Sequence, residues 1–328
     1  MGLVPTFKVK VNGESIATSG DGFPLEVSVV DEEGLLCDFV TVTFGDPMGL
    51  LAVPKLGAKL TVDLGYEGDL GNFGEYFIDE CEISSSGRMS IRCKSIDYRS
   101  ALRNLNTRSF PKGSGEGISI EKIAQEVAKP YSMKVSCDDY TKSISFRKIH
   151  QRNETDLHFL TRLSQSRGCT LKIKENVICI LAKGTGQTAT GIVLPVVDIV
   201  RTQNVISWRY SRRQSEEYKS VSAFWRAWDT SEDKTVRVGS GEPVYGIPYR
   251  FPTEKEAKDA AKSKLESLRY GVESLECEIH GDIQIRAERL ANVKDLRNSI
   301  DGKWVIKRAE HRINHSGYVV SVQCERST

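Results

Sequence analysis

Two carboxylates in the middle of the chain, Glu154 and Asp156, have the residue type and the spacing that acid–base chemistry could use. A glycoside hydrolase needs such a pair, but its two carboxyl groups face each other across the bond that is broken. Glu154 and Asp156 instead fall at the start of a helix predicted from about Thr155 to Arg167. Carboxylates there stabilise the unpaired N–H groups and the positive end of the helix dipole. We therefore interpret both as structural residues and predict no catalytic residue.

Two further segments could bind phosphate or single-stranded nucleic acid. The segment Gly184 to Gly191 resembles a phosphate-binding loop in composition only, because it lacks G-K-[ST] and no helix pattern follows it. We interpret it as part of a flexible linker. The segment Ser207 to Arg213 interleaves aromatic residues with arginines, which is typical of single-strand binders. Two glutamates follow directly, however, and Trp208 and Tyr210 share one strand face as core residues would. No cofactor and no specific nucleic acid is predicted.

Histidine and cysteine are spaced poorly for a metal site. His311 and His315 have the H-x-x-x-H spacing of half a zinc finger, but no cysteine pair precedes them, so we expect them to flank a hairpin turn. The cysteines are scattered without a C-x-x-C pair, and we interpret them as small, reduced core residues. They are Cys37, Cys81, Cys93, Cys137, Cys169, Cys179, Cys277 and Cys324. No metal ligand is predicted.

The composition is ordinary for a globular protein. A chain of 328 residues is long enough for two or three domains with separate hydrophobic cores. Its 46 basic and 44 acidic side chains leave a net charge of +2, so no strong field attracts nucleic acid or an anionic membrane. The first residues lack a signal-peptide pattern, and no run approaches the roughly 20 apolar residues of a membrane span. We expect a chain folded in a cytosol, with no membrane segment.

The first hundred residues are expected to form strands. Phe7, Val9 and Val11 alternate with lysines up to Asn12–Gly13, a pair that favours a two-residue hairpin turn because both residues tolerate positive φ. Further alternating runs bring the total to about six strands, which is enough for a small barrel or sandwich.

Three helices are predicted after a glycine-rich boundary at Pro111 to Gly117. Each has a start signal, which is Ser119 for the first, Thr155 or Asn153 for the second, and the T-x-x-E capping box that Thr253 forms with Glu256 for the third. The spacing of apolar residues places the helices at about 120–128, 155–167 and 254–270. A hairpin from Cys169 to Leu181, with its turn near Glu175–Asn176, follows the second helix.

One β-hairpin occurs twice, at Gly74 to Cys93 and at Gly302 to Cys324. Each copy opens with glycine, continues with an aromatic residue and an apolar pair, and carries a glutamate before a Ser-Gly turn. The matched residues are Gly74, Tyr76, Ile78, Glu82 and Gly87 in the first copy and Gly302, Trp304, Ile306, Glu310 and Gly317 in the second. Solenoid repeats have periods of roughly 50 residues at most, so this spacing predicts two copies of one β-domain.

The predicted fold class is α+β. It has two similar small antiparallel β-barrel domains, a pseudo-duplication, with an intervening α/β domain that carries two helices and a hairpin. The expected domains are 1–108 for the first barrel, 109–190 for the helix-containing domain, and 191–328 for the second barrel with the helix at 254–270 inserted. Trp225 and Trp228 are assigned to barrel core or a subunit interface rather than to a ligand platform.

The stretch from Gln151 to Leu163 resembles the segment Q-x-x-E-[ST]-D-x-x-F-L-x-R-L of phage late control D proteins. These are the central hubs of contractile-tail baseplates and are related to the N-terminal part of type VI secretion VgrG spikes. The residues that match, with the glycine that follows, are Gln151, Glu154, Asp156, Phe159, Leu160, Arg162, Leu163 and Gly168. Three further landmarks are similar, at Phe77 to Glu82, Leu105 to Phe110 and Glu310 to Tyr318. One departure is Ala287 to Ala291, where the family pattern has a glycine.

This resemblance implies a structural protein of the virion tail baseplate, assembled in the host bacterial cytoplasm. It implies a homotrimer between the tail tube protein and the central spike protein, with the tape-measure protein and the baseplate wedge proteins as further partners. Three subunits with two similar barrels each would present six similar surfaces, so that a sixfold tube could sit on a threefold spike. The parent particle could be a phage, a defective prophage or a tailocin.

Two alternatives belong to other classes of function. One is a hub-associated peptidoglycan hydrolase, which would need a catalytic domain, and no segment is left unassigned for it. The other is a monomeric β-barrel module that binds glycan or nucleic acid, which should expose an aromatic groove. The oligomeric state of the purified protein separates the hub from the monomeric module.

Overall fold

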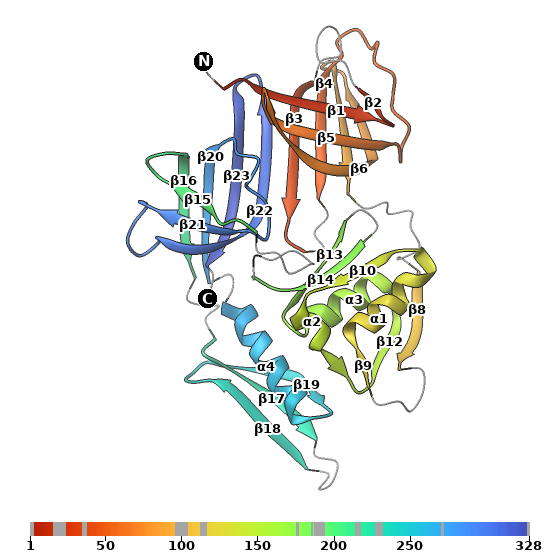
Figure 1. Ribbon diagram of the computed structural model, residues 1–328, viewed down its shortest axis with the longest axis vertical. Helices are drawn as coiled ribbons and strands as arrows, with labels where there is room; N and C mark the ends of the chain where they lie inside the picture. Colours follow the sequence, from red (N-terminus) through yellow and green to blue (C-terminus); the bar gives the residue numbers. More distant parts are fainter. Residues whose placement is uncertain are drawn as a thin grey trace. The chain divides into compact units, whose positions relative to one another are not determined.

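The computed structural model describes residues 3–15, 24–34, 38–95, 104–111, 117–174, 177–184, 186, 194–213, 218–226, 232–269 and 272–326 (Figure 1). The chain forms two compact units, each assembled from separate stretches of sequence. Unit 1 contains Met1–Arg99, Pro195–Arg209 and Glu276–Cys324, and unit 2 contains Ser100–Leu194, Tyr210–Leu275 and Glu325–Thr328. The division into three consecutive domains stays a prediction.

Most of unit 1 is a sheet that is 13-stranded in the described part of the chain. Its N-terminal strands are β1 (Pro5–Val11), β2 (Glu14–Ser15), β3 (Pro24–Glu32), β4 (Phe39–Gly45), β5 (Lys59–Tyr66), β6 (Asp69–Ser84) and β7 (Arg88–Lys94). Its C-terminal strands are β15 (Val197–Val200), β16 (Val205–Arg212), β20 (Glu273–His280), β21 (Leu290–Lys294), β22 (Gly302–Asn314) and β23 (Gly317–Arg326). The order is β16-β20-β23-β22-β3-β4-β7-β6-β5-β1-β2, with β21 on β22 and β15 on β21.

Alternating side chains explain why these segments form strands. Leu60, Val62 and Leu64 of β5 are all 0% exposed, while the residues between them remain partly accessible. The predicted Asn12–Gly13 turn is confirmed, because both residues have positive φ and Val11 pairs with Glu14 across the turn. The core of unit 1 therefore lies on the aliphatic face of a twisted antiparallel sheet.

The prediction of two barrels is not confirmed as stated. The described strands of both sequence halves lie in one sheet, because Glu26–Glu32 of β3 pairs antiparallel with Arg308–Asn314 of β22. Figure 1 shows these two strands side by side. An alternating pattern reveals that a segment forms a strand but not which distant strand pairs with it.

The two halves of the sheet nevertheless share a strand order. The N-terminal half runs β1-β5-β6-β7-β4-β3, and the C-terminal half runs β15-β21-β22-β23-β20-β16. The repeated hairpin is β6–β7 in the first half and β22–β23 in the second. One pair differs, because β1 is antiparallel to β5 while β15 is parallel to β21.

Unit 2 contains two of the three predicted helices in a mixed α and β region. Its elements are β8 (Leu105–Phe110), β9 (Ile118–Ser119), α1 (Ile120–Ala128), a 3₁₀ turn (Lys129–Tyr131), β10 (Lys134–Cys137), α2 (Asp139–Ser143), β11 (Ser145–Phe146), β12 (Ile149–Thr155), α3 (Asp156–Gln165), β13 (Cys169–Lys174) and β14 (Val177–Ala182). The predicted N-caps Ser119 and Thr155 are confirmed by their hydrogen bonds to Lys122 N and His158 N. The hairpin β13–β14 is also confirmed, although its Glu175–Asn176 turn lies outside the described residues.

The third predicted helix belongs to a small layer of its own in unit 2. It is α4 (Glu254–Arg269), and the backbone N–H of Glu256 donates to Thr253 Oγ1 at 3.2 Å, as the capping box predicts. The helix packs on a sheet with the order β18-β17-β19, formed by β17 (Ser220–Arg226), β18 (Asp233–Gly239) and β19 (Val244–Phe251) (Figure 1). These strands were assigned to a second barrel, and they instead form a separate sheet. None of the described helices is long and apolar enough to cross a bilayer.

Candidate functional site

The family-like segment is built around the junction of two strands and a helix. β12 pairs antiparallel with β8, so that Gln151 lies opposite Arg108 and Glu154 opposite Asn106. A register shift occurs between Gln151 and Glu154, where Asn153 has a φ of 48°. Helix α3 then starts at Asp156. This geometry places Asp156 beside Asn106 and Arg108 of β8.

Asp156 is the centre of a buried polar cluster. Its Oδ1 accepts hydrogen bonds from Gln151 Nε2 at 2.7 Å and from Asn106 Nδ2 at 3.2 Å, and it forms an ion pair with Arg108. Its Oδ2 accepts the Tyr131 hydroxyl at 2.7 Å. Burial, followed by the hydrogen bond to Asp156 and its charge, raises the pKa of Tyr131 to about 12. The carboxylate therefore joins β8, β12, α3 and the 3₁₀ turn.

Glu154 lies in a second, more open cluster. Its Oε1 accepts a hydrogen bond from Arg162 Nη2 at 2.6 Å, and its Oε2 lies 2.7 Å from His158 Nδ1. Arg162 also donates to the carbonyl of His150 at 3.2 Å. Burial opposes ionisation of Glu154, but the hydrogen bonds from Arg162 and His158 and their charges outweigh it and lower the pKa of Glu154. Arg162 of α3 therefore bonds to residues of β12 and not to Asp156.

The two carboxylates do not face each other across an open space. Asp156 is held by four side chains from other elements, whereas Glu154 is held by Arg162 and His158 of helix α3. Such bonding stabilises the ionised form of a carboxylate and fixes its position. The arrangement fastens strands to a helix, and it does not form the opposed pair that glycoside hydrolysis needs.

The remaining residues of the motif form the core beneath this junction. Phe159 is 0% exposed, and its ring stacks on Phe110 with centroids 5.5 Å apart. Leu160 and Leu163 are also buried. Gly168 has a φ of 67°, and a Cβ there would come within 3.1 Å of Ser263 Oγ of α4, so a side chain would disturb the contact between α4 and the end of α3.

Sequence reasoning missed three of the four partners of Asp156, which are Asn106, Arg108 and Tyr131. Asn106 and Arg108 lie in the Leu105 to Phe110 landmark, which was noted as family-like but given no role. Tyr131 is the last residue of the 3₁₀ turn, and no role was assigned to it from the sequence. The residue types gave one signal for these partners. A tyrosine and an arginine next to predicted element ends are candidates to bond a buried carboxylate.

The bases of the two repeated hairpins are equivalent in the structure. Tyr76 and Ile78 are each 2% exposed, and Trp304 and Ile306 are each 0% exposed. The backbone hydrogen bonds around the two isoleucines also match: Ile78 N to Ala58 O and Gly57 N to Ile78 O in one, and Ile306 N to Arg289 O and Glu288 N to Ile306 O in the other. The glycines Gly74, Gly87, Gly302 and Gly317 all have positive φ.

The matched glutamates have different environments. Glu82 is exposed, whereas Glu310 is half-buried, accepts a hydrogen bond from Ser28 at 3.3 Å and pairs with Arg308. Ser86 and Gly87 lie in the first turn. In the second hairpin Gly317 begins β23, so the Ser-Gly pair only partly lies in the turn.

His311 and His315 do not share a site. His311 is 0% exposed; its Nε2–H donates to the carbonyl of Ile285 at 2.8 Å, and its Nδ1 accepts the Tyr318 hydroxyl at 2.7 Å. Burial, with the nearby charge of Arg286, lowers the pKa of His311 to about 3, so the ring is neutral. His315 is exposed in the turn. Within the described ranges, no three histidine, cysteine or acidic residues gather as a metal site.

The other candidate segments have structural surroundings where they are described. Trp208 and Tyr210 are half-buried on β16. Trp225 packs beside the core under α4 with Lys234 5.5 Å from its ring, whereas Trp228 lies outside the described residues. Most of the linker from Lys183 to Gly191 also lies outside them.

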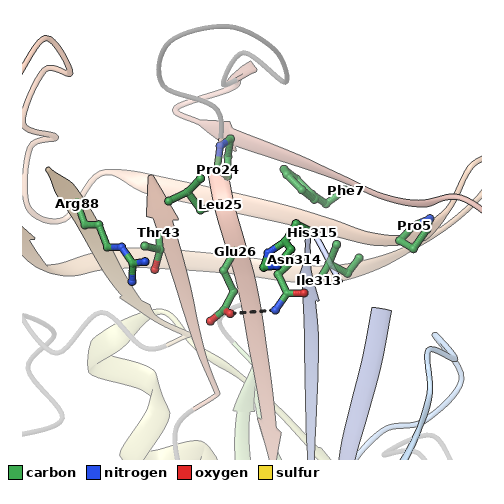
Figure 2. A pocket seen from close by; sticks show the side chains of 10 residues that line it. All are labelled: Pro5, Phe7, Pro24, Leu25, Glu26, Thr43, Arg88, Ile313, Asn314 and His315. Carbon is green, nitrogen blue, oxygen red and sulfur yellow. Dashed lines mark hydrogen bonds between the residues drawn. The ribbon is translucent and has the colours of Figure 1, made fainter. Parts of the chain in front are cut away.

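A cavity of about 620 Å³ opens in unit 1 between β1 and the strands β3 and β22 (Figure 2). Its lining residues are Pro5, Phe7, Pro24, Leu25, Glu26, Thr43, Arg88, Ile313, Asn314 and His315. Asn314 Nδ2 donates to Glu26 Oε2 at 3.3 Å, which joins β22 and β3 at this point. Among the described lining residues Glu26 is the only carboxylate, and it accepts the hydrogen bond from Asn314, so these residues form no opposed acid–base pair.

Comparisons with known proteins agree with this fold. Residues 116–317 match the phage tail baseplate hub (GPD) family. The chain is 23% identical over 368 residues to the probable baseplate hub protein of Escherichia phage 186, covering 98% of this chain and 93% of that protein. The 43 kDa tail protein of prophage MuSo2 from Shewanella oneidensis has a TM-score of 0.73 at 16% identity, covering 98% of each chain. The E. coli c3393 protein, described as a component of the type VI secretion system, has a TM-score of 0.63 at 12% identity, covering 98% of this chain and 77% of that one.

Proposed function

The chain belongs to the phage tail baseplate hub (GPD) family, and we propose that three copies of it form the hub that joins a sixfold tail tube to a threefold central spike. The observation that carries this proposal is the family match over residues 116–317, together with similarity to a curated hub protein along almost the whole chain. The tail tube, the spike, the tape-measure protein and the baseplate wedge proteins are the proposed partners in the virion.

The shared strand order supports the symmetry of this proposal. Two halves of one sheet have the same order of six strands, and the hairpins β6–β7 and β22–β23 take matching places in it. Three chains would contribute six such halves. Homo-oligomers form closed rings when a repeated contact closes on itself. A ring of six similar halves would present six similar binding surfaces to a sixfold tube.

We also propose that the hub acts by assembly rather than by catalysis. The support is the geometry of Glu154 and Asp156, which are held by separate sets of donors. A variant with Glu154→Gln and Asp156→Asn should leave any cell-wall degradation in a zymogram unchanged. Loss of such activity in that variant would favour the hydrolase alternative.

The homotrimer is tested by measuring mass in solution. Light scattering over a concentration series, with and without the cognate spike protein, should give three times the mass of one chain. Electron micrographs of the same sample should show rings with six similar lobes. A chain that stays monomeric under all of these conditions would contradict the hub trimer and favour the monomeric binding module.

A further inference from the structure

The far ends of the two hairpins differ in what lies beside them. In β22, the segment Arg308–Asn314 pairs with β3 on the side away from β23. In β6, the matching segment Glu80–Ser84 pairs with β7 alone among the described strands, because the pairing with β5 stops at Phe77. One hairpin end therefore lies in the middle of the sheet. The other is an open strand edge in the described part of the chain, and such an edge can pair with another chain.

The burial of matching positions follows this difference. Counted from Ile78 and Ile306, Cys81 corresponds to Ala309 and Ile83 to His311. Ala309 and His311 are both 0% exposed, whereas Ile83 is 55% exposed although it pairs with the buried Met89. An exposed isoleucine on the core face of a strand indicates a surface that another element covers.

The pairing of β22 with β3 joins the two halves of the sheet within one chain. A second element of this junction is the loop between β20 and β21. The Arg286 guanidinium lies 3.4 Å from the centroid of the Phe73 ring and donates to the carbonyl of Asn72 at 3.0 Å. Ile283 packs against Gly71, where an added Cβ would come within 3.0 Å of the isoleucine. This loop therefore packs the C-terminal half of the sheet against the N-terminal half.

The equivalent loop of the N-terminal half lies between β4 and β5 and is exposed. Its two ends are bonded to the hairpin, with Asp46 N donating to Gly87 O and Gly57 N to Ile78 O, both at 2.7 Å. The Asp46 carboxylate also accepts the backbone N–H of Leu50 at 2.7 Å. The loop is thus held in place, yet four of its apolar side chains are between 56% and 76% exposed. They are Met48, Leu50, Val53 and Leu56.

The strand that corresponds to β3 is β16, and it is also an edge. Among the described strands it ends the path of the sheet and pairs with β20 only. β16 carries the exposed arginines Arg209 and Arg212, and the open edge of β6 carries the exposed glutamates Glu80 and Glu82. The two edges therefore have opposite charges.

The junction within the chain uses the reverse charges. In that junction the basic residue lies on the hairpin strand β22 and the acidic residue lies on β3, since Arg308 pairs with Glu32 at 3.3 Å. An acidic β6 edge attracts a basic β16 and repels an acidic β3. This pattern selects one pairing between copies and disfavours the wrong one.

We propose that the β6 edge, Glu80–Ser84, of one copy pairs with the β16 edge of the next copy, while the β4–β5 loop packs against that same neighbour. The contact is head to tail, so each copy uses both of its free edges. Repeated three times, it closes a ring in which every half of the sheet has a neighbour on both sides. This inference rests on the proposed homotrimer and names the surface that forms it.

Charge reversal tests the contact. The variant Glu80→Arg with Glu82→Arg places like charges on both edges, as does Arg209→Glu with Arg212→Glu. Each should raise the dissociation constant of the trimer by about 100-fold or more, because like charges across an interface are strongly unfavourable. The chain that combines all four changes should recover the trimer, since its edges are complementary again. Mass photometry reports each state.

A matched control changes the same charges elsewhere on β6 and its turn. Glu67→Arg with Asp69→Arg lies at the opposite end of the strand and should leave the trimer intact. Circular dichroism should show that every variant remains folded. Trimers that persist in both charge-reversed variants would overturn the β6–β16 contact and leave the hub trimer standing. A wild-type chain that never trimerises would overturn both proposals.

Discussion

The two copies of the hairpin are alike at the base and unlike at the far end. At the base, Tyr76 and Trp304 are both buried, and each donates to a backbone carbonyl at 2.9 Å. At the far end, β22 is paired with β3 and buries His311, while β6 has an open edge and an exposed Ile83. Similar local sequence therefore gives a similar local fold. Whether a side chain is buried depends on the strand that lies beside it.

The far ends of the two hairpins also differ in whether their polar groups are buried. On β22, His311 and its partner Tyr318 are buried and bonded to each other, and burial raises the pKa of Tyr318. On β6, Glu80 and Glu82 remain in contact with water. A polar group can be buried only where its partners are fixed, so the paired end can hold a histidine and the open end holds carboxylates.

The largest effect is expected at the bases of the hairpins. Trp304→Ala should lower the free energy of unfolding by about 4 kcal/mol, because a fully buried aromatic side chain leaves a cavity. Tyr76→Ala should cost about the same, since Tyr76 is equally enclosed. Urea unfolding followed by circular dichroism measures both, with the exposed Lys303→Ala as the control. If Tyr76→Ala lowered the free energy of unfolding by less than about 1 kcal/mol, the bases of the two hairpins would not be equivalent.

A smaller effect is expected at the paired end of β22. Ile313 is 3% exposed, and Ile313→Ala should cost about 3 kcal/mol of unfolding free energy. The same urea titration measures it. A cost near zero would mean that pairing with β3 does not bury this end in solution, and the comparison between the two ends would then fail.

The buried histidine predicts a pH dependence. The pKa of His311 is near 6.5 in the unfolded chain and about 3 in the folded one, where it faces Arg286, Tyr318 and Asp31. Between these values the unfolded state binds more protons, so stability is complete above pH 6.5 and falls as the pH drops toward 3. The loss should reach about 2 kcal/mol at pH 5. In His311→Phe this part of the slope should vanish, and an unchanged slope would assign it to other groups.

Local structure was largely predictable from the sequence. The helices α1, α3 and α4 begin where Ser119, Thr155 and Thr253 predict, because caps and apolar spacing act within a few residues. The hairpins follow from alternation and turn residues for the same reason. The pairing of β3 with β22 was not predictable, since it joins residues such as Ser28 and Glu310 that are 282 positions apart.

The candidate site was predictable to a similar degree. The motif located Asp156 and Gln151, which are five residues apart and bonded. The other partners of Asp156 are Tyr131, Arg108 and Asn106, which lie 25, 48 and 50 residues away in the sequence. A single sequence does not reveal which distant donors contact a carboxylate. The buried cluster could therefore be identified only from the structure.

The smallest effect is expected at Ile83, and it gives the sharpest test of the comparison. Ile83 and Ile313 are each the second-last residue of their strands, so Ile83→Ala and Ile313→Ala make the same change at the far end of each hairpin. In the isolated chain Ile83→Ala should change the free energy of unfolding by less than about 0.5 kcal/mol, because the side chain is already 55% exposed. In the trimer the neighbouring β16 would cover it, and the same substitution should weaken association by about tenfold. Unfolding of the diluted monomer and a dilution series of the trimer measure the two numbers. Equal and negligible effects in both states would mean that the β6 edge stays open after assembly.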